Sequence, residues 1–159
     1  MTHRVLVAGI GNIFLGDDGF GVEVAGRLAK LELPDWVAVG DYGISGLHLA
    51  YDLADGVEMA ILVDAAPRGG EPGTVYVIEP GPAQGSTTFF DGHGMQPDVV
   101  LSMLGSLGAH VGRVLVVGCE PASADYGIGL SPPVAAAVDD AVKVVLELIS
   151  ERADREASN

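Results

Sequence analysis

The sequence RVLVAGIGNIFLGDDGFG, residues Arg4 to Gly21, begins with an unbroken apolar run from Val5 to Ala8 that ends at a glycine. A continuous apolar run of this kind is typical of a strand buried on both faces of a parallel sheet. The glycines after the run permit a sharp exit from the strand, because they carry no Cβ. Two adjacent carboxylates, Asp17 and Asp18, then come just before a predicted helix.

A strand, a Gly-x-Gly sequence and a helix in this order suggest a dinucleotide-binding fold. The fingerprint of that fold needs a third glycine three residues after the second, and Phe14 stands at that position. Two acids also occupy the place where a pyrophosphate binds bare amides at the positive end of a helix. A nucleotide-dependent enzyme, with Asp41 as the acid for a ribose, is therefore a minor alternative.

The two acids of the opening stretch can serve in two ways. A carboxylate at the start of a helix caps it and interacts favourably with the helix dipole, and we expect Asp17 or Asp18 to do so. Because one cap needs only one acid, the other is a candidate ligand or acid–base group.

Strands and helices alternate through the first half of the chain. A helix is predicted over Val22–Leu33, in which Gly26 has low helix propensity and is expected to pack closely on the sheet. Buried or half-buried strands are predicted over residues 36–40 and 59–63, with a helix over 46–54 between them. This alternation implies parallel strands joined by right-handed crossovers.

The connection to the next strand is too short for a helical crossover, so that strand is expected to be antiparallel and near an edge. The remaining predicted elements are this strand over residues 74–79, a loop over 81–95, a helix over 97–107, a strand over 113–118, and a helix that begins at Pro132 after Ser131. The sequence thus predicts one α/β domain over residues 1–150 and a polar, fraying tail over 151–159.

Composition limits the classes of partner. The net charge of −14 disfavours nucleic acid and anionic membranes, and with them a peptidyl-tRNA hydrolase of α/β fold. No stretch is apolar over the length of a membrane span, and no signal peptide is evident. Cys119 is the single cysteine, which excludes an internal disulfide, so we expect a cytoplasmic protein.

Three other residues invite a catalytic interpretation. Cys119 follows a predicted strand, but no histidine adjoins it in sequence and a free cysteine is commonly a small buried hydrophobe, so a cysteine hydrolase is a minor alternative. Ser45 does not form a nucleophile elbow, because Leu47 replaces the last glycine of G-x-S-x-G. His48 is interpreted as an ordinary helix-face residue.

An acid also follows the third predicted strand. Asp64 comes directly after four aliphatic residues, where an unpaired carboxylate is costly to bury. In a sheet of order 2-1-3, the ends of strands one and three lie about 5 Å apart, so Asp64 and an acid of the opening stretch can face a common point. The long loop carries His93 between two glycines and can deliver its imidazole to that point. Two oxygen ligands and one nitrogen ligand suit a borderline divalent metal.

Motifs along nearly the whole chain resemble those of the hydrogenase maturation proteases. The first is GIGNIFLGDDGFG at residues 9–21. The others are DYGISG at 41–46, VDA at 63–65, GHG at 92–94, GCEP at 118–121 and GIGLSP at 127–132. Several separated motifs in the correct order are far more specific than any one of them.

The resemblance implies a three-layer α/β/α sandwich with a mixed, mostly parallel five-stranded sheet and one antiparallel strand. It also implies a monomeric endopeptidase that removes the C-terminal extension from the precursor of a nickel–iron hydrogenase large subunit after nickel insertion. Asp18, Asp64 and His93 match the family's metal-contacting residues and are the expected catalytic and metal-binding set. The first acid is Glu in some members, and the role of Asp17 is open.

The expected metal is nickel carried by the substrate, for which other divalent ions can substitute. Binding of that ion by Asp18, Asp64 and His93 would place the peptide bond beside a water activated by the metal or by a carboxylate. The leading alternative is a non-enzymatic accessory protein that uses the same three residues to bind nickel.

Overall fold

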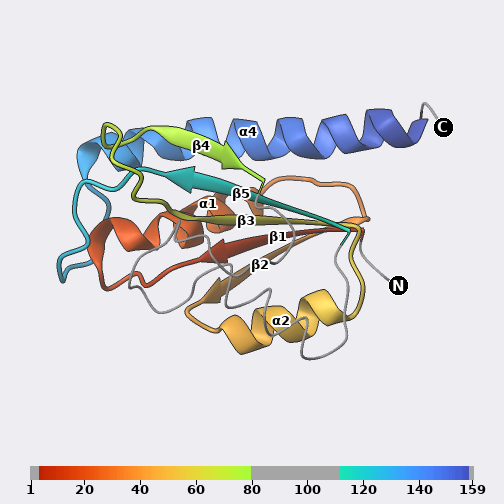
Figure 1. Cartoon of the computed structure of the whole chain (residues 1–159), viewed down its shortest axis with the longest axis horizontal. Helices are drawn as coiled ribbons and strands as arrows, with labels where there is room; N and C mark the ends of the chain where they lie inside the picture. Colours follow the sequence, from red (N-terminus) through yellow and green to blue (C-terminus); the bar gives the residue numbers. More distant parts are fainter. Residues whose placement is uncertain (1–3, 80–111, 158–159) are drawn as a thin grey trace.

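A computed structural model describes residues 4–79 and 112–157 of the chain, and its strands form one mixed sheet (Figure 1). The strand order is β2-β1-β3-β5-β4. The strands are β1 (Val5–Ile10), β2 (Val37–Gly43), β3 (Met59–Ala65), β4 (Val75–Ile78) and β5 (Arg113–Cys119). The pairs β1–β2, β1–β3 and β3–β5 are parallel, and only β4 is antiparallel to its neighbour. The order 2-1-3, on which the predicted meeting of the acids depends, is thus present, and the predicted antiparallel strand at an edge is confirmed.

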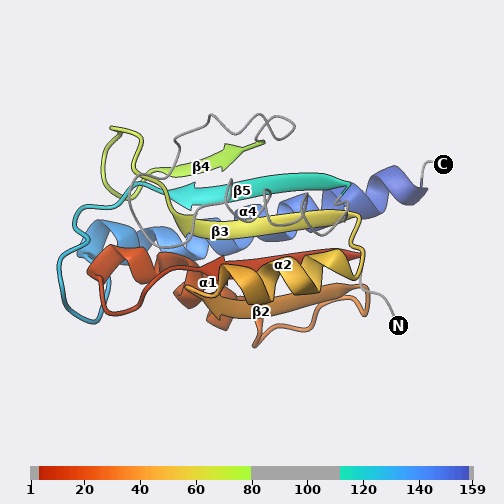
Figure 2. The same ribbon diagram turned by 60° about the horizontal axis from the view of Figure 1, so that its bottom comes forward.

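Helices cover both faces of the sheet, which confirms the predicted three-layer α/β/α class (Figure 2). They are α1 (Phe20–Leu28), α2 (Gly46–Ala54) and α4 (Pro132–Ala157), and a short 3-10 turn, η1 (Gly16–Gly19), precedes α1. One face carries α1 and α4, joined by an ion pair between Arg27 and Asp139, and the other carries α2. Ser45 caps α2 as predicted, accepting a hydrogen bond from the His48 amide at 3.4 Å.

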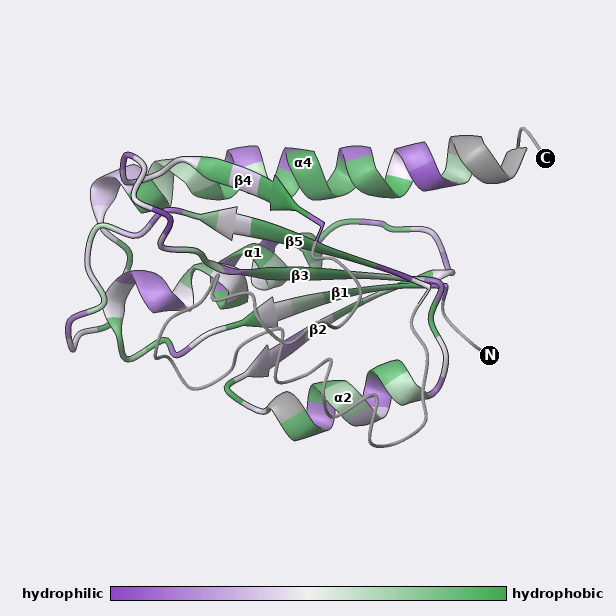
Figure 3. Ribbon diagram, viewed as in Figure 1, coloured by the Kyte–Doolittle hydropathy of each residue, from purple (hydrophilic) through white to green (hydrophobic). Residues whose placement is uncertain are grey.

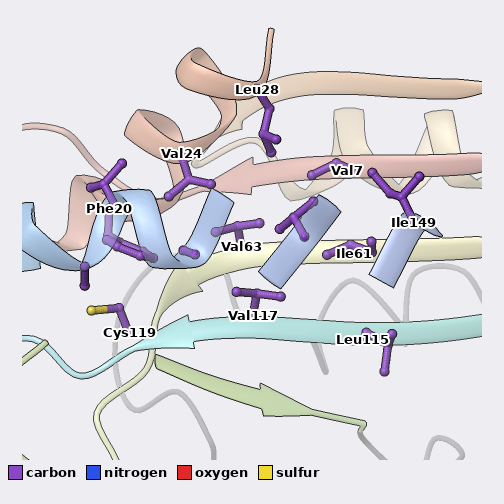
Figure 4. Close-up of a cluster of buried hydrophobic side chains, with 14 of the residues drawn as sticks. Val7, Phe20, Val24, Leu28, Ile61, Val63, Leu115, Val117, Cys119 and Ile149 are labelled. Atoms are coloured by element: carbon purple, nitrogen blue, oxygen red, sulfur yellow. The ribbon is translucent and has the colours of Figure 1, made fainter. Parts of the chain in front are cut away.

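Alternation along the strands divides the apolar side chains between two cores. Val5 and Val7 of β1 face α1 and α4, whereas Leu6 and Ala8 face α2. Strands β1 and β3 are mostly apolar, whereas β2 carries polar colour toward its end and α4 alternates between polar and apolar residues (Figure 3). The core under α1 and α4 is the larger, and Phe20 lies fully buried at the end nearest the carboxyl ends of the parallel strands (Figure 4).

Two glycines set how closely α1 approaches the sheet. A Cβ on Gly21 would lie 1.9 Å from the carbonyl oxygen of Val63, and one on Gly9 would lie 2.5 Å from that of Gly21. By contrast, no atom lies within 4 Å of the position that a Cβ would take on Gly26. The predicted close packing of Gly26 is therefore wrong, because the residue faces away from the sheet. The helix also begins earlier and ends earlier than the predicted range 22–33.

The last helix extends past residue 150, where the sequence predicts a fraying tail. Its course through Glu151 and beyond is stabilised by Arg152, which forms an ion pair with Glu58 and lies over the ring of Trp36, 5.3 Å from the centroid. The predicted loop over 81–95 and helix over 97–107 lie outside the described residues. Among the helices that the structure describes, none has the length and apolarity needed to cross a membrane.

Candidate active site

Asp18 and Asp64 lie together at the edge where the parallel strands end. Asp18 belongs to η1, which follows β1, and Asp64 is the penultimate residue of β3, the neighbour of β1 in the sheet. Their exposed fractions are only 8% and 4%. The structure thus brings together these two acids, as the sequence predicts for the acids after strands one and three. They lie close enough for the charge of Asp18 to raise the pKa of Asp64.

The environment of Asp64 favours its protonated form. Burial raises its pKa well above the usual value, and the negative charge of Asp18 raises it further. A hydrogen bond from the Ala65 amide to Asp64 Oδ1, 2.7 Å long, opposes this shift without cancelling it. A carboxyl group with a raised pKa beside a second carboxylate is a common arrangement in acid–base sites and in cation sites.

Gly11 provides the space in which the two acids meet. Its φ of 134° is a conformation that favours glycine, and a Cβ there would lie 1.8 Å from the carbonyl oxygen of Asp18 and 3.3 Å from Asp64 Oδ1. The next residue orients the carboxylate of Asp18, because the backbone amide of Asn12 donates to Asp18 Oδ2 at 2.8 Å. At Gly11, the backbone of the loop after β1 therefore lies so close to both acids that a side chain has no room.

Asp17 has a different role from its neighbour. It is 1% exposed, and its carboxylate accepts hydrogen bonds from the amides of Ala122, Ser123 and Ser131 and from the Ser131 hydroxyl. Burial raises the pKa of Asp17, but these hydrogen bonds outweigh it and the pKa lies below its usual value. The prediction that Asp17 or Asp18 caps the helix is wrong, because neither η1 nor α1 has a side-chain cap.

Two residues at the end of β5 also prove to be structural. The Glu120 carboxylate is 5% exposed and accepts from the Arg68 and Gly70 amides and the Tyr76 hydroxyl, so it holds the turn before β4. Cys119 is fully buried in the larger core (Figure 4). Burial, with the charges of Asp17 and Glu120, raises the pKa of its thiol to about 12. A thiol that stays protonated is a poor nucleophile, which removes the cysteine-hydrolase alternative.

The predicted histidine of the site, His93, lies outside the described residues. Within the described ranges no cluster of three or more His, Cys, Asp or Glu side chains could hold a metal, and the roles of Asp18, Asp64 and His93 as metal ligands remain predictions. His48 remains a helix-face residue, as interpreted, because its exposed ring pairs with Asp52 at 3.4 Å and packs edge-on against Tyr42.

An apolar rim, made of Ile13, Phe14, Tyr126 and Ile128, lies on two loops at the same edge of the sheet (Figures 1 and 2). The exposed fractions of these side chains are 44%, 58%, 93% and 77%. The two loops are joined by the Gly127 amide, which donates to the Phe14 carbonyl at 2.9 Å. Large apolar side chains gathered in the open next to a site are typical of a surface that contacts another macromolecule.

Comparison with known proteins decides the family. The family model described as hydrogenase maturation protease matches residues 22–148 of the chain. The chain belongs to the hydrogenase maturation protease family. The matched residues include Asp64 and His93 and begin four positions after Asp18, and the predicted enzyme class, a peptidase, is confirmed.

Two relatives of this maturation protease match it over nearly their whole length. It is 38% identical over 147 residues to a putative hydrogenase maturation protease of Methanocaldococcus jannaschii, a match that covers 89% of this chain and 94% of the relative. The hydrogenase 2 maturation protease of Escherichia coli is 33% identical, with 93% of this chain and 92% of the relative covered. The solved structure of the hydrogenase maturating endopeptidase HybD from E. coli superposes with a TM-score of 0.80 at 32% identity, covering 94% and 93% of the two chains.

Sequence reasoning missed the hydrogen-bonding roles of Asp17 and Glu120 in this maturation protease. The partners of Asp17 lie more than 100 residues away in the chain. The donors are mostly backbone amides, which any residue type supplies, so no side-chain pattern marks them. The only available signal was the unusual pairing of two acids in the opening stretch, which left one of them without an assigned role.

Proposed function

We propose that this maturation protease is an endopeptidase that removes the C-terminal extension from the precursor of a nickel–iron hydrogenase large subunit. The precursor is its substrate only after nickel has been inserted, because the nickel ion itself is what the site recognises. The main support is the buried pair of Asp18 and Asp64, two acids that lie close enough for the charge of Asp18 to raise the pKa of Asp64.

The acid pair explains why a cation is needed for tight binding. Burial raises the pKa of Asp64 well above its usual value, and repulsion by the Asp18 carboxylate raises it further. A divalent ion carried by the substrate offsets that repulsion and replaces the proton of Asp64, so a precursor that lacks the metal gains no such stabilisation. His93, the third predicted ligand, would add a nitrogen donor to the two oxygens, a set that suits nickel and other borderline divalent ions.

The apolar rim supports a polypeptide substrate. Tyr126 and Ile128 are on one loop and Phe14 on the other, all exposed beside the acids. Side chains of this kind supply most of the contact energy in protein interfaces. A precursor docked on the rim would bring its scissile bond to the edge at which Asp18 and Asp64 lie.

Hydrolysis then needs one activated water. A carboxylate of the pair would accept a proton from the attacking water, or the substrate's nickel would lower the pKa of that water, so that its oxygen bonds to the carbonyl carbon. The proton released by that water is held by the carboxylate and passed to the leaving nitrogen as the C–N bond breaks. The products are a shortened large subunit with a new carboxyl end and a free C-terminal peptide.

Intact-mass analysis of a purified precursor tests this function. We expect wild-type protein to shorten the nickel-loaded precursor and to leave the nickel-free precursor uncut. Asp64→Asn and His93→Ala should slow cleavage by about 100-fold or more while the fold is retained, as for loss of an acid–base group or a metal ligand. Cleavage of both precursors at equal rates would contradict recognition of nickel.

The second candidate is a non-enzymatic accessory protein that binds nickel through the same residues. It is favoured only by the acid pair, which can bind a cation without catalysing hydrolysis. The same assay separates the two functions, because an accessory protein would bind the loaded precursor and leave its mass unchanged.

A further inference from the structure

We propose that Asp17 is a positioning residue that joins the turn carrying Asp18 to the loop over residues 122–131 and so fixes Asp18 beside Asp64. This inference deepens the proposed function, on which it rests for the catalytic meaning of Asp18, but the geometry it describes exists in the free protein. It gives the two adjacent acids of the opening stretch distinct roles.

The hydrogen bonds of Asp17 use both of its carboxylate oxygens. Oδ2 accepts from the Ala122 amide at 2.8 Å, the Ser123 amide at 3.0 Å and the Ser131 hydroxyl at 2.8 Å. Oδ1 accepts from the Ser131 amide at 2.7 Å. A carboxylate offers about four acceptor positions. With four donors on a side chain that is 1% exposed, the carboxylate of Asp17 is committed to hydrogen bonds within the protein, unlike that of Asp18.

Backbone contacts of Asp17 and of the residues just before it connect the same two segments. The Asp17 amide donates to the Ser123 carbonyl at 3.0 Å, and the Gly16 amide donates to the Gly127 carbonyl at 2.9 Å. Leu15 and Gly127 form an isolated parallel bridge. Among the described side chains of η1, only that of Asp17 forms hydrogen bonds with the loop over residues 122–131. These buried hydrogen bonds add to the backbone contacts between the two segments.

These contacts of Asp17 also constrain its neighbour, Asp18. Asp18 cannot move independently of Asp17, because both belong to the single turn η1 and the Asp18 amide donates to the Leu15 carbonyl at 3.1 Å. The carboxylate of Asp18 in turn accepts from the Asn12 amide at 2.8 Å. The backbone amide resonance of Asn12 therefore reports the position of the Asp18 carboxylate, and it can be measured in the free protein without metal or substrate.

Asp17→Asn tests the assignment, because an amide NH₂ replaces one of the acceptor oxygens and faces amide donors. The matched control is Glu120→Gln, which disturbs a second buried carboxylate with three donors but has no hydrogen bond to η1. For each variant we would record the thermal midpoint, the ¹⁵N–¹H resonance of the Asn12 amide, and the affinity for Ni²⁺ ions alone by calorimetry. Ser131→Ala removes one of the four bonds and serves if Asp17→Asn does not fold.

We expect both buried-acid variants to lose stability, and only the Asp17 variant to shift the Asn12 resonance and to weaken nickel binding by about tenfold or more, the usual effect of removing a group that orients a ligand. Ser131→Ala should change the same two readouts in the same direction by a smaller amount. An Asn12 resonance unchanged in both Asp17→Asn and Ser131→Ala, or shifted equally by Glu120→Gln, would overturn the proposal. If the wild type binds no free nickel, the Asn12 resonance still decides the positioning role, and only the proposed function is weakened.

Discussion

Asp64 is buried beside Asp18, and the charge of Asp18 adds to burial in raising the pKa of Asp64. The turn η1 holds Asp18 and strand β3 holds Asp64 at the edge where the parallel strands end. Burying two like charges costs stability, a cost that a bound cation would offset.

The raised pKa predicts how stability depends on pH. Between the unfolded pKa of an aspartate and the higher folded pKa of Asp64, the folded state keeps a proton that the unfolded state has lost, so the free energy of unfolding falls as pH rises through this window. Asp64→Asn removes this pH-dependent loss of stability, which amounts to about 1.4 kcal/mol for each unit by which folding raises the pKa of Asp64. Denaturant unfolding of the wild type and Asp64→Asn from pH 4 upward should show the variant gaining relative stability with pH. An exposed-acid control, Asp35→Asn, should show no such trend, and a constant difference for Asp64→Asn would contradict the assignment.

The packing of α1 predicts opposite effects for two glycines of the same helix. Gly26→Ala places a methyl group in open space and should raise the free energy of unfolding by about 0.5–1 kcal/mol, because alanine has the higher helix propensity. Gly21→Ala forces a Cβ against the Val63 carbonyl and should lower it by about 3 kcal/mol or more. Urea titrations measure both changes, and equal effects of the two substitutions would contradict the described approach of α1 to β3.

The apolar rim predicts a binding defect without a folding defect. Tyr126→Ser should raise KM for the precursor by about fivefold to tenfold, the effect of losing about 1 kcal/mol of contact energy, and should leave kcat and the thermal midpoint nearly unchanged. Leu31→Ser is the matched control, since Leu31 is 45% exposed and lies on neither loop of the rim. Equal kinetic effects of both substitutions would argue against docking on the rim.

The burial of Cys119 predicts that catalysis does not need its thiol. With a pKa of about 12 and no exposure, the thiol should not react with iodoacetamide at pH 8 in the folded protein. Cys119→Ala should retain cleavage within about threefold of wild type and lose about 1 kcal/mol of stability. Steady-state cleavage assays check this. A folded Cys119→Ala protein without activity would restore the cysteine mechanism.

Much of the fold was predictable because its strands are buried on both faces. The apolar runs of β1 and β3 stand out in sequence, and the short link before β4 excluded a parallel crossover. Element ends were less predictable. The start of α1 depends on η1, and the extent of α4 depends on Arg152 stacking over Trp36, a contact between residues more than 100 positions apart.

The candidate site was predictable in part. Asp18 and Asp64 follow neighbouring strands, and sheet geometry alone brings them to one edge. The difference between Asp17 and Asp18 was not predictable, because it arises from backbone amides of a distant loop and not from any side-chain pattern. His93 as the third ligand is still a prediction.

A crystal structure of the protein soaked in Ni²⁺, with the ion located by its anomalous scattering, tests the central claim most directly. We expect one nickel ion about 2.1 Å from carboxylate oxygens of both Asp18 and Asp64, with the His93 imidazole as a further ligand and no contact to Asp17. Nickel bound elsewhere, or bound at this edge by only one of the two acids, would contradict it.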